Sequence, residues 1–179
     1  MRIYLETSRL TLRCFTAGDE DRLYELDSDP AVMRFINGGR PTPRAEIRDQ
    51  LIPSAGYWAA EAAPSGEFLG WFHFQPAAPG QTDLGYRLRR AIWGRGYATE
   101  GCRALIRKGF TELGVQRVTA QTMTVNAASR RVLEKSGMTF VRTINPGFTK
   151  NIPGSEHGDA EYAVTRTEWT AWSLPAGKQ

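Results

Sequence analysis

Hydrophobic and polar positions alternate along several short stretches of this chain, a period of two that is typical of half-buried β-strands. Some of these stretches are rich in aromatic residues, and others in β-branched residues. Two aromatic-rich stretches flank the turn-forming triplet Pro64-Ser65-Gly66, which predicts an antiparallel hairpin. The predicted strands cover residues 9–15, 56–62, 66–76, 81–90, 115–123, 139–144 and 160–169.

Between these strands the apolar residues recur at the spacing of an amphipathic helix. Capping residues, prolines and glycines mark where such helices begin and end. The helices are predicted between Thr16 and Pro30, between Thr42 and Pro53, between Gly96 and Gly114, and between Asn126 and Gly137. The resulting order, β-α-α-β-β-β-α-β-α-β-β, predicts an α+β fold with a mixed, mostly antiparallel sheet in one domain over residues 1–179.

Composition narrows the class of protein. A chain of 179 residues with 41% hydrophobic residues suits one compact domain. Its apolar runs are far shorter than the ~20 residues that span a bilayer. The first residues lack a signal-peptide pattern, so we expect a cytoplasmic protein without membrane contact. We interpret Cys14 and Cys102 as small buried hydrophobic residues, and His73 and His157 without a CxxC pattern predict no metal site.

A net charge of +4 is carried mostly by arginine, and four arginines lie close together in the sequence at Arg87, Arg89, Arg90 and Arg95. Such a cluster suits an anionic ligand, although arginines also occur on ordinary solvated faces. The cluster flanks residues 92–101, "IWGRGYATEG", where a strand runs into a helix.

This stretch combines two glycines with a helix start. A helix start leaves N–H donors unpaired and carries partial positive charge. Gly94 and Gly96 remove side chains that would block a phosphate from reaching those donors. The stretch therefore predicts a diphosphate site, with a plain strand-turn-helix as the alternative. The dinucleotide-binding and P-loop patterns do not fit, because their further glycines and the Gly-Lys-Ser/Thr sequence are missing.

A second motif follows at the start of the next helix, where Asn126 and Ser129 lie three residues apart. "WGRGYATE" at residues 93–100 and "NAASRRVLEKSG" at residues 126–137 together resemble the GNAT superfamily of acyl-CoA-dependent N-acetyltransferases. The likeness is strongest to the branch that acetylates the N-termini of ribosomal proteins, although Met138 stands where that branch usually has an aromatic residue. Similar opening and closing segments extend the resemblance over nearly the whole chain.

The resemblance implies acetyl-CoA as co-substrate. The family's loop binds the pyrophosphate through backbone amides, the preceding strand pairs with pantetheine, and the side chain equivalent to Asn126 bonds the pantetheine arm. Ser129 stands where the branch places a hydroxyl that protonates the departing thiolate; capping of the helix would also explain it. The cofactor residues implied in this way are Leu88, Arg89, Arg90, Ile92, Trp93, Gly94, Arg95, Gly96, Tyr97, Ala98, Thr99, Asn126 and Ser129.

The sequence offers several candidates for the group that accepts a proton from the attacking amine. Where the ribosomal branch has a catalytic glutamate, this chain has the neutral segment "NPGFTK" at residues 145–150. Asp83 is the candidate base, and the alternatives are His73, Glu156, His157 or a water relay. Structural roles would equally explain Asp83 and His73.

The acceptor is predicted to be a primary amine, either a peptide α-amine or a small molecule. Residues 35–39 and 145–158 are expected to flank its cleft, since loops on a rigid scaffold carry specificity. A non-catalytic acyl-CoA sensor on the same fold is one alternative function. An RNA- or ribosome-binding module is another, although the arginines lack an aromatic-basic stacking pattern, so a nucleic-acid partner is not expected. Related enzymes suggest a monomer or homodimer.

Overall fold

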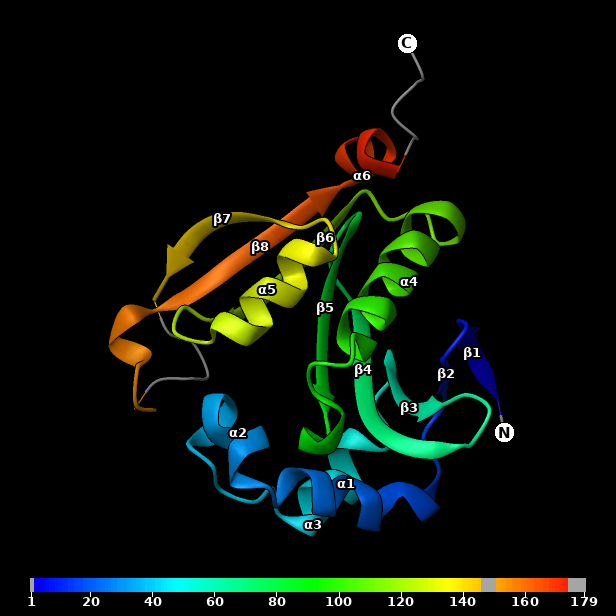
Figure 1. Ribbon diagram of the computed structural model, residues 1–179, viewed down its shortest axis with the longest axis vertical. Coiled ribbons are helices and arrows are strands. Elements are labelled where there is room, and N and C mark those ends of the chain that lie inside the picture. The colour runs from blue at the N-terminus through cyan, green and yellow to red at the C-terminus, as the bar shows by residue number, and fades with distance from the viewer. Residues whose placement is uncertain (1, 146–150, 174–179) are drawn as a thin grey trace.

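The computed structural model describes residues 2–145 and 151–173, and Figure 1 shows their arrangement. Within these residues the chain forms an eight-stranded sheet with the order β1-β2-β3-β4-β5-β6-β8-β7. Neighbouring strands are antiparallel except β5 and β6, which are parallel, so the predicted α+β class with a mixed sheet is confirmed. The strands are β1 (Ile3–Glu6), β2 (Leu10–Arg13), β3 (Tyr57–Ala62), β4 (Glu67–Ala78), β5 (Gln81–Leu88), β6 (Arg117–Met123), β7 (Thr139–Ile144) and β8 (Asp159–Thr165).

Helices cover both faces of this sheet. Figure 1 shows the two long helices α4 and α5 lying across one face, while α1, α2 and α3 group together at one end of the strands. None of the helices in the part of the chain that the structure describes has the length and apolar character required to cross a membrane. The α-helices are α1 (Glu20–Asp27), α2 (Pro30–Asn37), α3 (Arg44–Glu46), α4 (Tyr97–Glu112), α5 (Ala127–Lys135) and α6 (Arg166–Ser173). The π-helical segment η2 (Ile47–Leu51) follows α3 directly, and η1 (Ala17–Asp19), η3 (Arg90–Ile92) and η4 (Ser155–His157) are 3-10 turns.

Two hydrophobic clusters lie on opposite sides of the central strands, because successive strand residues point to opposite faces. On β4, Phe72 belongs to the large cluster that includes α4 residues, whereas Trp71 belongs to the smaller cluster with α1 and η2. We call these the α4 face and the α1 face. Leu84 and Leu88 are both buried on the α4 face, as the alternation on β5 requires.

Several sequence-based predictions of local structure need correction. The strand β1 was not predicted, and Pro30 begins a second helix as well as following the first. Asp29 caps that helix by accepting from Ala31 N–H at 2.8 Å. The final strand ends at Thr165 rather than residue 169, because Thr165 and Glu168 exchange capping hydrogen bonds that start α6.

The two cysteines also differ from each other. Cys102 is buried as predicted, but Cys14 is exposed, so the interpretation of Cys14 as a buried residue is wrong. Cys14 lies just beyond β2, and the neighbouring Arg13 is the residue whose side chain is buried. Burial raises the pKa of the Cys102 thiol to about 12, despite an opposing hydrogen bond from Ser136.

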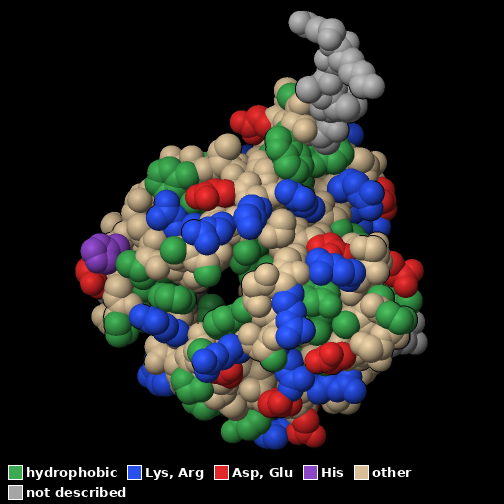
Figure 2. Space-filling view, in the orientation of Figure 1, with side chains coloured by type: hydrophobic (Ala, Val, Ile, Leu, Met, Phe, Trp, Pro, Cys, Tyr) green, Lys and Arg blue, Asp and Glu red, His purple; other side chains and the backbone are tan. Residues whose placement is uncertain are grey.

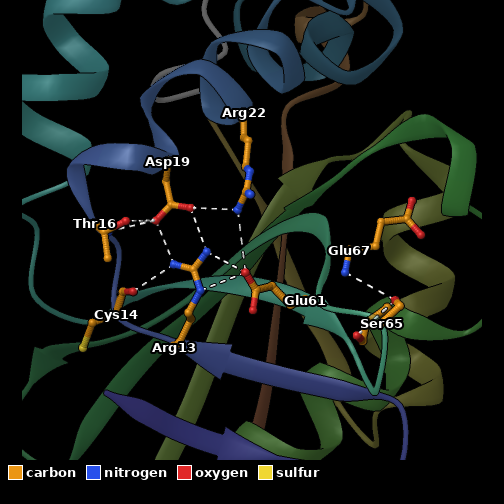
Figure 3. A network of polar contacts seen from close by, with 9 residues as sticks. Arg13, Cys14, Thr16, Asp19, Arg22, Glu61, Ser65 and Glu67 are labelled. Atoms are coloured by element: carbon orange, nitrogen blue, oxygen red, sulfur yellow. Dashed lines mark hydrogen bonds and ion pairs between the residues drawn. The ribbon is translucent and has the colours of Figure 1, made fainter. Parts of the chain in front are cut away.

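A buried ion network fixes α1 against β2 and β3, as Figure 3 shows. The Arg13 side chain donates to both Asp19 oxygens at 2.7 Å and to Glu61 Oε1 at 2.6 and 2.9 Å. Hydrogen bonds to Asp19 raise the pKa of Arg13 and outweigh the opposing effect of burial. Asp19 also accepts from Thr16, which completes a capping box at the start of the helical segment.

The sheet forks between its two parallel strands. The ladder of β5 and β6 runs from Gln81 opposite Arg117 to Asp83 opposite Thr119 and stops there, although both strands continue. Beyond the fork, β5 remains paired only with β4, up to Leu88. A ligand entering here would meet backbone groups of β5 that have no strand partner on that side.

Candidate active site

The loop that joins β5 to α4 has the geometry of an anion site. Gly94 and Gly96 have φ angles of 75° and 84°, in the left-handed region that favours glycine. A side chain at Gly94 would meet no atom within 4 Å, so the backbone conformation rather than crowding requires glycine there. Gly96 is the N-cap of the 16-residue helix α4, and no side chain caps this end. The first N–H groups of α4 are therefore available to an anionic ligand.

Three contacts hold this loop in place. The Trp93 indole N–H donates to the carbonyl oxygen of Leu88 at 2.8 Å, which folds the loop back on the end of β5. Arg9 donates to the carbonyl oxygen of Arg95 at 3.0 Å and to Glu100 at 2.7 Å. Burial alone would raise the pKa of Glu100, but hydrogen bonds from Thr7 and Arg9 outweigh it and lower the pKa. Arg9 was not predicted as a site residue, because it lies 86 positions from the loop carbonyl that it binds.

A basic groove lies beside the loop. It is an open cavity of about 590 Å³, lined by Arg9, Gly96, Thr99, Glu100, Arg103, Ala104, Arg107 and Lys135. Figure 2 shows Lys and Arg side chains spread across this face of the molecule, around a hollow near its centre. The groove offers four cationic side chains to phosphate groups, and Glu100 is the one carboxylate among its lining residues.

The four arginines that lie close together in the sequence separate into two pairs in the structure. Arg87 forms an ion pair with Asp27 at 2.6 Å, and Arg89 forms one with Glu25, so both side chains turn toward α1. The N–H of Arg89 already donates to the carbonyl oxygen of Leu69 at 2.8 Å. If this strand end pairs with pantetheine, as predicted, the pairing must therefore use backbone groups other than the Arg89 N–H. Arg90 is exposed at η3 and Arg95 is exposed within the loop.

Ser129 lies at the start of α5, opposite β5. Its backbone N–H donates to Asn126 Oδ1 at 3.2 Å, so Asn126 caps the helix as predicted. Tyr86 OH, from β5, lies 3.3 Å from Ser129 Oγ. Burial raises the pKa of Tyr86, although its hydrogen bond to Ser129 opposes this. Tyr86 was not predicted as a site residue, because its contact with Ser129 lies 43 positions away along the chain.

Glu134 of the second motif anchors the same helix. Tyr162 on β8 donates to Glu134 at 2.8 Å and accepts from Arg130 at 3.0 Å. These bonds tie α5 to the sheet and thereby hold Ser129 over β5.

His73 and Asp83 lie together on the α1 face. His73 Nε2 is 2.9 Å from Asp83 Oδ2, and Asp83 belongs to the last residue pair before the fork. Asp83 and Tyr86 are three residues apart on one strand, so their side chains point to opposite faces. The two candidate catalytic groups, Asp83 and Ser129, therefore approach the fork from opposite sides of the sheet.

The remaining candidates are placed differently. Glu156 and His157 face each other at 3.6 Å on η4, and both are strongly exposed. Of the segment 145–150, residues 146–150 lie outside the described residues. In the described part of the chain there is no group of three or more His, Cys, Asp or Glu side chains that could hold a metal ion.

Comparison with known proteins identifies the family. The model of the acetyltransferase (GNAT) domain matches residues 9–139. This chain belongs to the GNAT acetyltransferase family. A similar relative is the FsC-acetyl coenzyme A-N(2)-transacetylase of Aspergillus fumigatus, which is 35% identical over 96% of this chain and 80% of its own length. A putative ribosomal N-acetyltransferase of Bacillus subtilis, YdaF, is 30% identical over 89% of this chain and 93% of its own length.

Solved structures share the fold. A GNAT-family acetyltransferase from Bacillus anthracis superposes with a TM-score of 0.78 at 25% identity, covering 93% of this chain and 99% of that one. The aminoglycoside acetyltransferase AAC(6')-Ib, solved with acetyl-CoA, superposes with a TM-score of 0.74 at 23% identity over the same shares.

These findings confirm the predicted activity at the level of the family. The chain is an acetyl-CoA-dependent N-acetyltransferase with a GNAT fold, and acetyl-CoA is its co-substrate. The enzyme interpretation is thus confirmed. The free N–H groups at the start of α4 and the adjoining basic groove suit the phosphates of this co-substrate.

Proposed function

We propose that this enzyme acetylates a primary amine of a small molecule, with direct attack of the amine on acetyl-CoA in a ternary complex. The observation that carries the proposal is the fork in the sheet, with Ser129 on one face and Asp83 on the other. A thioester held in the fork would have a proton donor on the sulfur side and a proton acceptor on the amine side.

The preference for a small molecule is supported by the relatives. The fungal transacetylase, named for an N(2) amine of FsC, matches more of this chain at higher identity than the putative ribosomal enzyme does. A peptide α-amine, as in the ribosomal branch, is the second candidate, and YdaF is the observation that favours it. Residues 1–179 as one domain, a cytoplasmic location and a monomeric or homodimeric state stay predictions.

The co-substrate site is proposed at the β5–α4 loop and the start of α5. The N–H groups of the loop and of the first turn of α4 would bind the pyrophosphate, as the left-handed glycines allow. The basic groove would meet the outer phosphate of CoA. Because the oxygen of Leu88 accepts from Trp93, pantetheine would pair with the other unpartnered backbone groups of β5 beyond the fork. The proposed binding residues are Arg90, Ile92, Trp93, Gly94, Arg95, Gly96, Tyr97, Ala98, Thr99 and Asn126, and Ser129 would act at the sulfur. Leu88 and Arg89, which the resemblance also implied, are left out because the Leu88 oxygen, the Arg89 N–H and the Arg89 side chain already have partners.

The proposed reaction proceeds by direct attack of the amine on the thioester of acetyl-CoA. The amine nitrogen bonds to the carbonyl carbon of the thioester while Asp83 takes up a proton from the amine. The carbon–sulfur bond then breaks, and the thiolate receives the Ser129 hydroxyl proton. Tyr86 OH, 3.3 Å from Ser129 Oγ, returns a proton to the serine and is itself recharged from solvent. The products are an N-acetyl amine and free CoA.

Calorimetric titration with acetyl-CoA tests the co-substrate site. Wild type is expected to bind, and Gly96→Val is expected to lose binding at least tenfold, because a branched side chain disfavours the left-handed conformation that aims the loop N–H groups. Gly66→Val is the matched control, since Gly66 has a φ of 72°, open space around it and a place in the β3–β4 turn. Equal affinity in both variants would contradict the loop assignment.

A panel of amines tests the acceptor class. CoA release is followed with a thiol reagent in a Cys14→Ser background, because the exposed Cys14 would react with that reagent. Polyamines, amino sugars and short peptides with free N-termini form the panel. Turnover of peptides alone would contradict the small-molecule proposal, and absence of turnover on every amine would contradict the acceptor proposal as a whole.

A further inference from the structure

We propose that His73 is a positioning residue for the reaction, which holds the Asp83 carboxylate at the fork with one oxygen turned toward the acceptor amine. This inference rests on the proposed role of Asp83. It was not available from the sequence, where His73 and Asp83 stood as alternative bases ten positions apart.

The side chains of His73 and Asp83 meet through one ring nitrogen and one carboxylate oxygen. His73 Nε2 meets Asp83 Oδ2 at 2.9 Å, whereas Asp83 Oδ1 has no hydrogen-bond partner among the described residues. The Asp83 side chain is 41% exposed and the His73 side chain 17%. The carboxylate therefore keeps one oxygen open to an incoming group, while the imidazole lies behind it.

The surroundings of His73 leave Nε2 as the ring nitrogen that meets a neighbouring side chain. Its other ring nitrogen, Nδ1, is buried without a partner in the described part of the chain. The ring packs against Tyr57, with centroids 5.1 Å apart, and against Trp71, with centroids 6.0 Å apart. These two ring contacts fix the imidazole, so its Nε2 is held against Asp83.

Gly85 makes this placement possible. It lies opposite His73 in the β4–β5 ladder, and a Cβ there would come within 2.5 Å of His73 Cε1. The imidazole occupies the space that any other residue at position 85 would fill. A side chain at position 85 would push the imidazole away from Asp83 while His73 and Asp83 themselves stay unchanged.

The charges nearby leave Asp83 as a negative site. On the same sheet face, Arg87 is neutralised by Asp27 of α1 at 2.6 Å. Tyr57 on β3 is close enough that Asp83 raises its pKa, after the larger effect of burial and against an opposing effect of Arg87.

On the next strands of this face, Arg117 of β6 is paired with Glu161 of β8 at 3.8 Å, and Arg142 of β7 also binds Glu161. Each of these three arginines thus lies against an acidic side chain, and two of them share Glu161. Among the described residues of β5–β8, Asp83 pairs with His73 rather than with an arginine or lysine, so an ammonium group that reaches the fork meets an acidic side chain there.

The test compares His73→Leu with His73→Gln, in the full chain and with the amine that wild type acetylates. Leucine removes the donor, and glutamine keeps an N–H donor near the position of Nε2. We expect His73→Leu to lower kcat/KM about tenfold to a hundredfold, the range for a hydrogen bond to a charged group. Affinity for acetyl-CoA should stay unchanged.

His73→Gln is expected to have a kcat/KM within about threefold of wild type. Gly85→Ala should reproduce the fall in kcat/KM seen with His73→Leu, which keeps the test valid if the leucine variant fails to fold. A kcat/KM of His73→Leu or Gly85→Ala equal to that of wild type would overturn the inference, as would a glutamine variant as impaired as the leucine variant. Failure of wild type on every amine would instead count against the proposed function.

Discussion

Replacement of Arg13 by methionine should destabilise the fold strongly while leaving its shape intact. Methionine keeps much of the side-chain volume but removes the guanidinium that pairs with Asp19 and Glu61. The Asp19 side chain is 1% exposed and that of Glu61 is 11%, so two nearly buried carboxylates would face each other. Arg22 lies 3.5 Å from Asp19 and 3.8 Å from Glu61 and would compensate only in part.

The expected cost is about 3–5 kcal/mol, the range for removing one partner of a buried ion pair. Against a typical stability of about 5–15 kcal/mol this is a large fraction. For a chain of this length it corresponds to a fall in Tm of roughly 6–20 °C. Urea unfolding followed by circular dichroism measures the free energy, and a thermal scan gives the Tm.

Arg22→Met is the matched control, because its side chain is 50% exposed and its contacts are longer. We expect it to cost less than about 1 kcal/mol. Adding Asp19→Asn and Glu61→Gln to Arg13→Met should recover part of the loss, since it removes the unpaired charges. A cost for Arg13→Met as small as that of Arg22→Met would refute the reasoning that the buried carboxylates depend on Arg13.

Two further predictions concern acid stability and the proton donor. Burial would raise the pKa of Asp19, but the bonds from Arg13 and Thr16 outweigh it and lower the pKa in the folded state. Asp19 therefore contributes its full share to the free energy of unfolding above its unfolded pKa of about 4, and this share is lost as the pH falls through the lower pKa of the folded state. Urea unfolding of Asp19→Asn should accordingly show a free energy of unfolding that falls less steeply than that of wild type between about pH 5 and 2. A slope equal to that of wild type would contradict this. Ser129→Ala should lower kcat about a hundredfold in steady-state assays with little change in acetyl-CoA affinity, whereas a change in affinity alone would assign Ser129 to binding or capping.

Local sequence signals predicted most of the secondary structure and the co-substrate loop. The helical spacing that ends at Gly114 and the Asn126 cap depend on neighbours within a few residues, and both are present in the structure. Gly94 and Gly96 likewise act through their own backbone angles. The family resemblance rests on these same segments, which is why the activity could be predicted before the fold was known.

The sites that depend on partners far along the chain were not predicted. Arg9 binds a loop 86 positions away, and Arg13 binds Glu61 48 positions away, so neither contact leaves a local pattern. The end of β8 was misplaced because the alternation continues past Thr165, where a capping box with Glu168 takes over.

The sequence by itself determined strands β2 to β8, helices α1, α4 and α5 and the glycine loop, because each depends on the propensity and spacing of adjacent residues. Only the tertiary structure decided that His73 and Asp83 form a pair and that Ser129 meets Tyr86, since those contacts depend on strand register and on which face each residue occupies. A shift of one residue in that register would turn each of these strand side chains to the other side of the sheet.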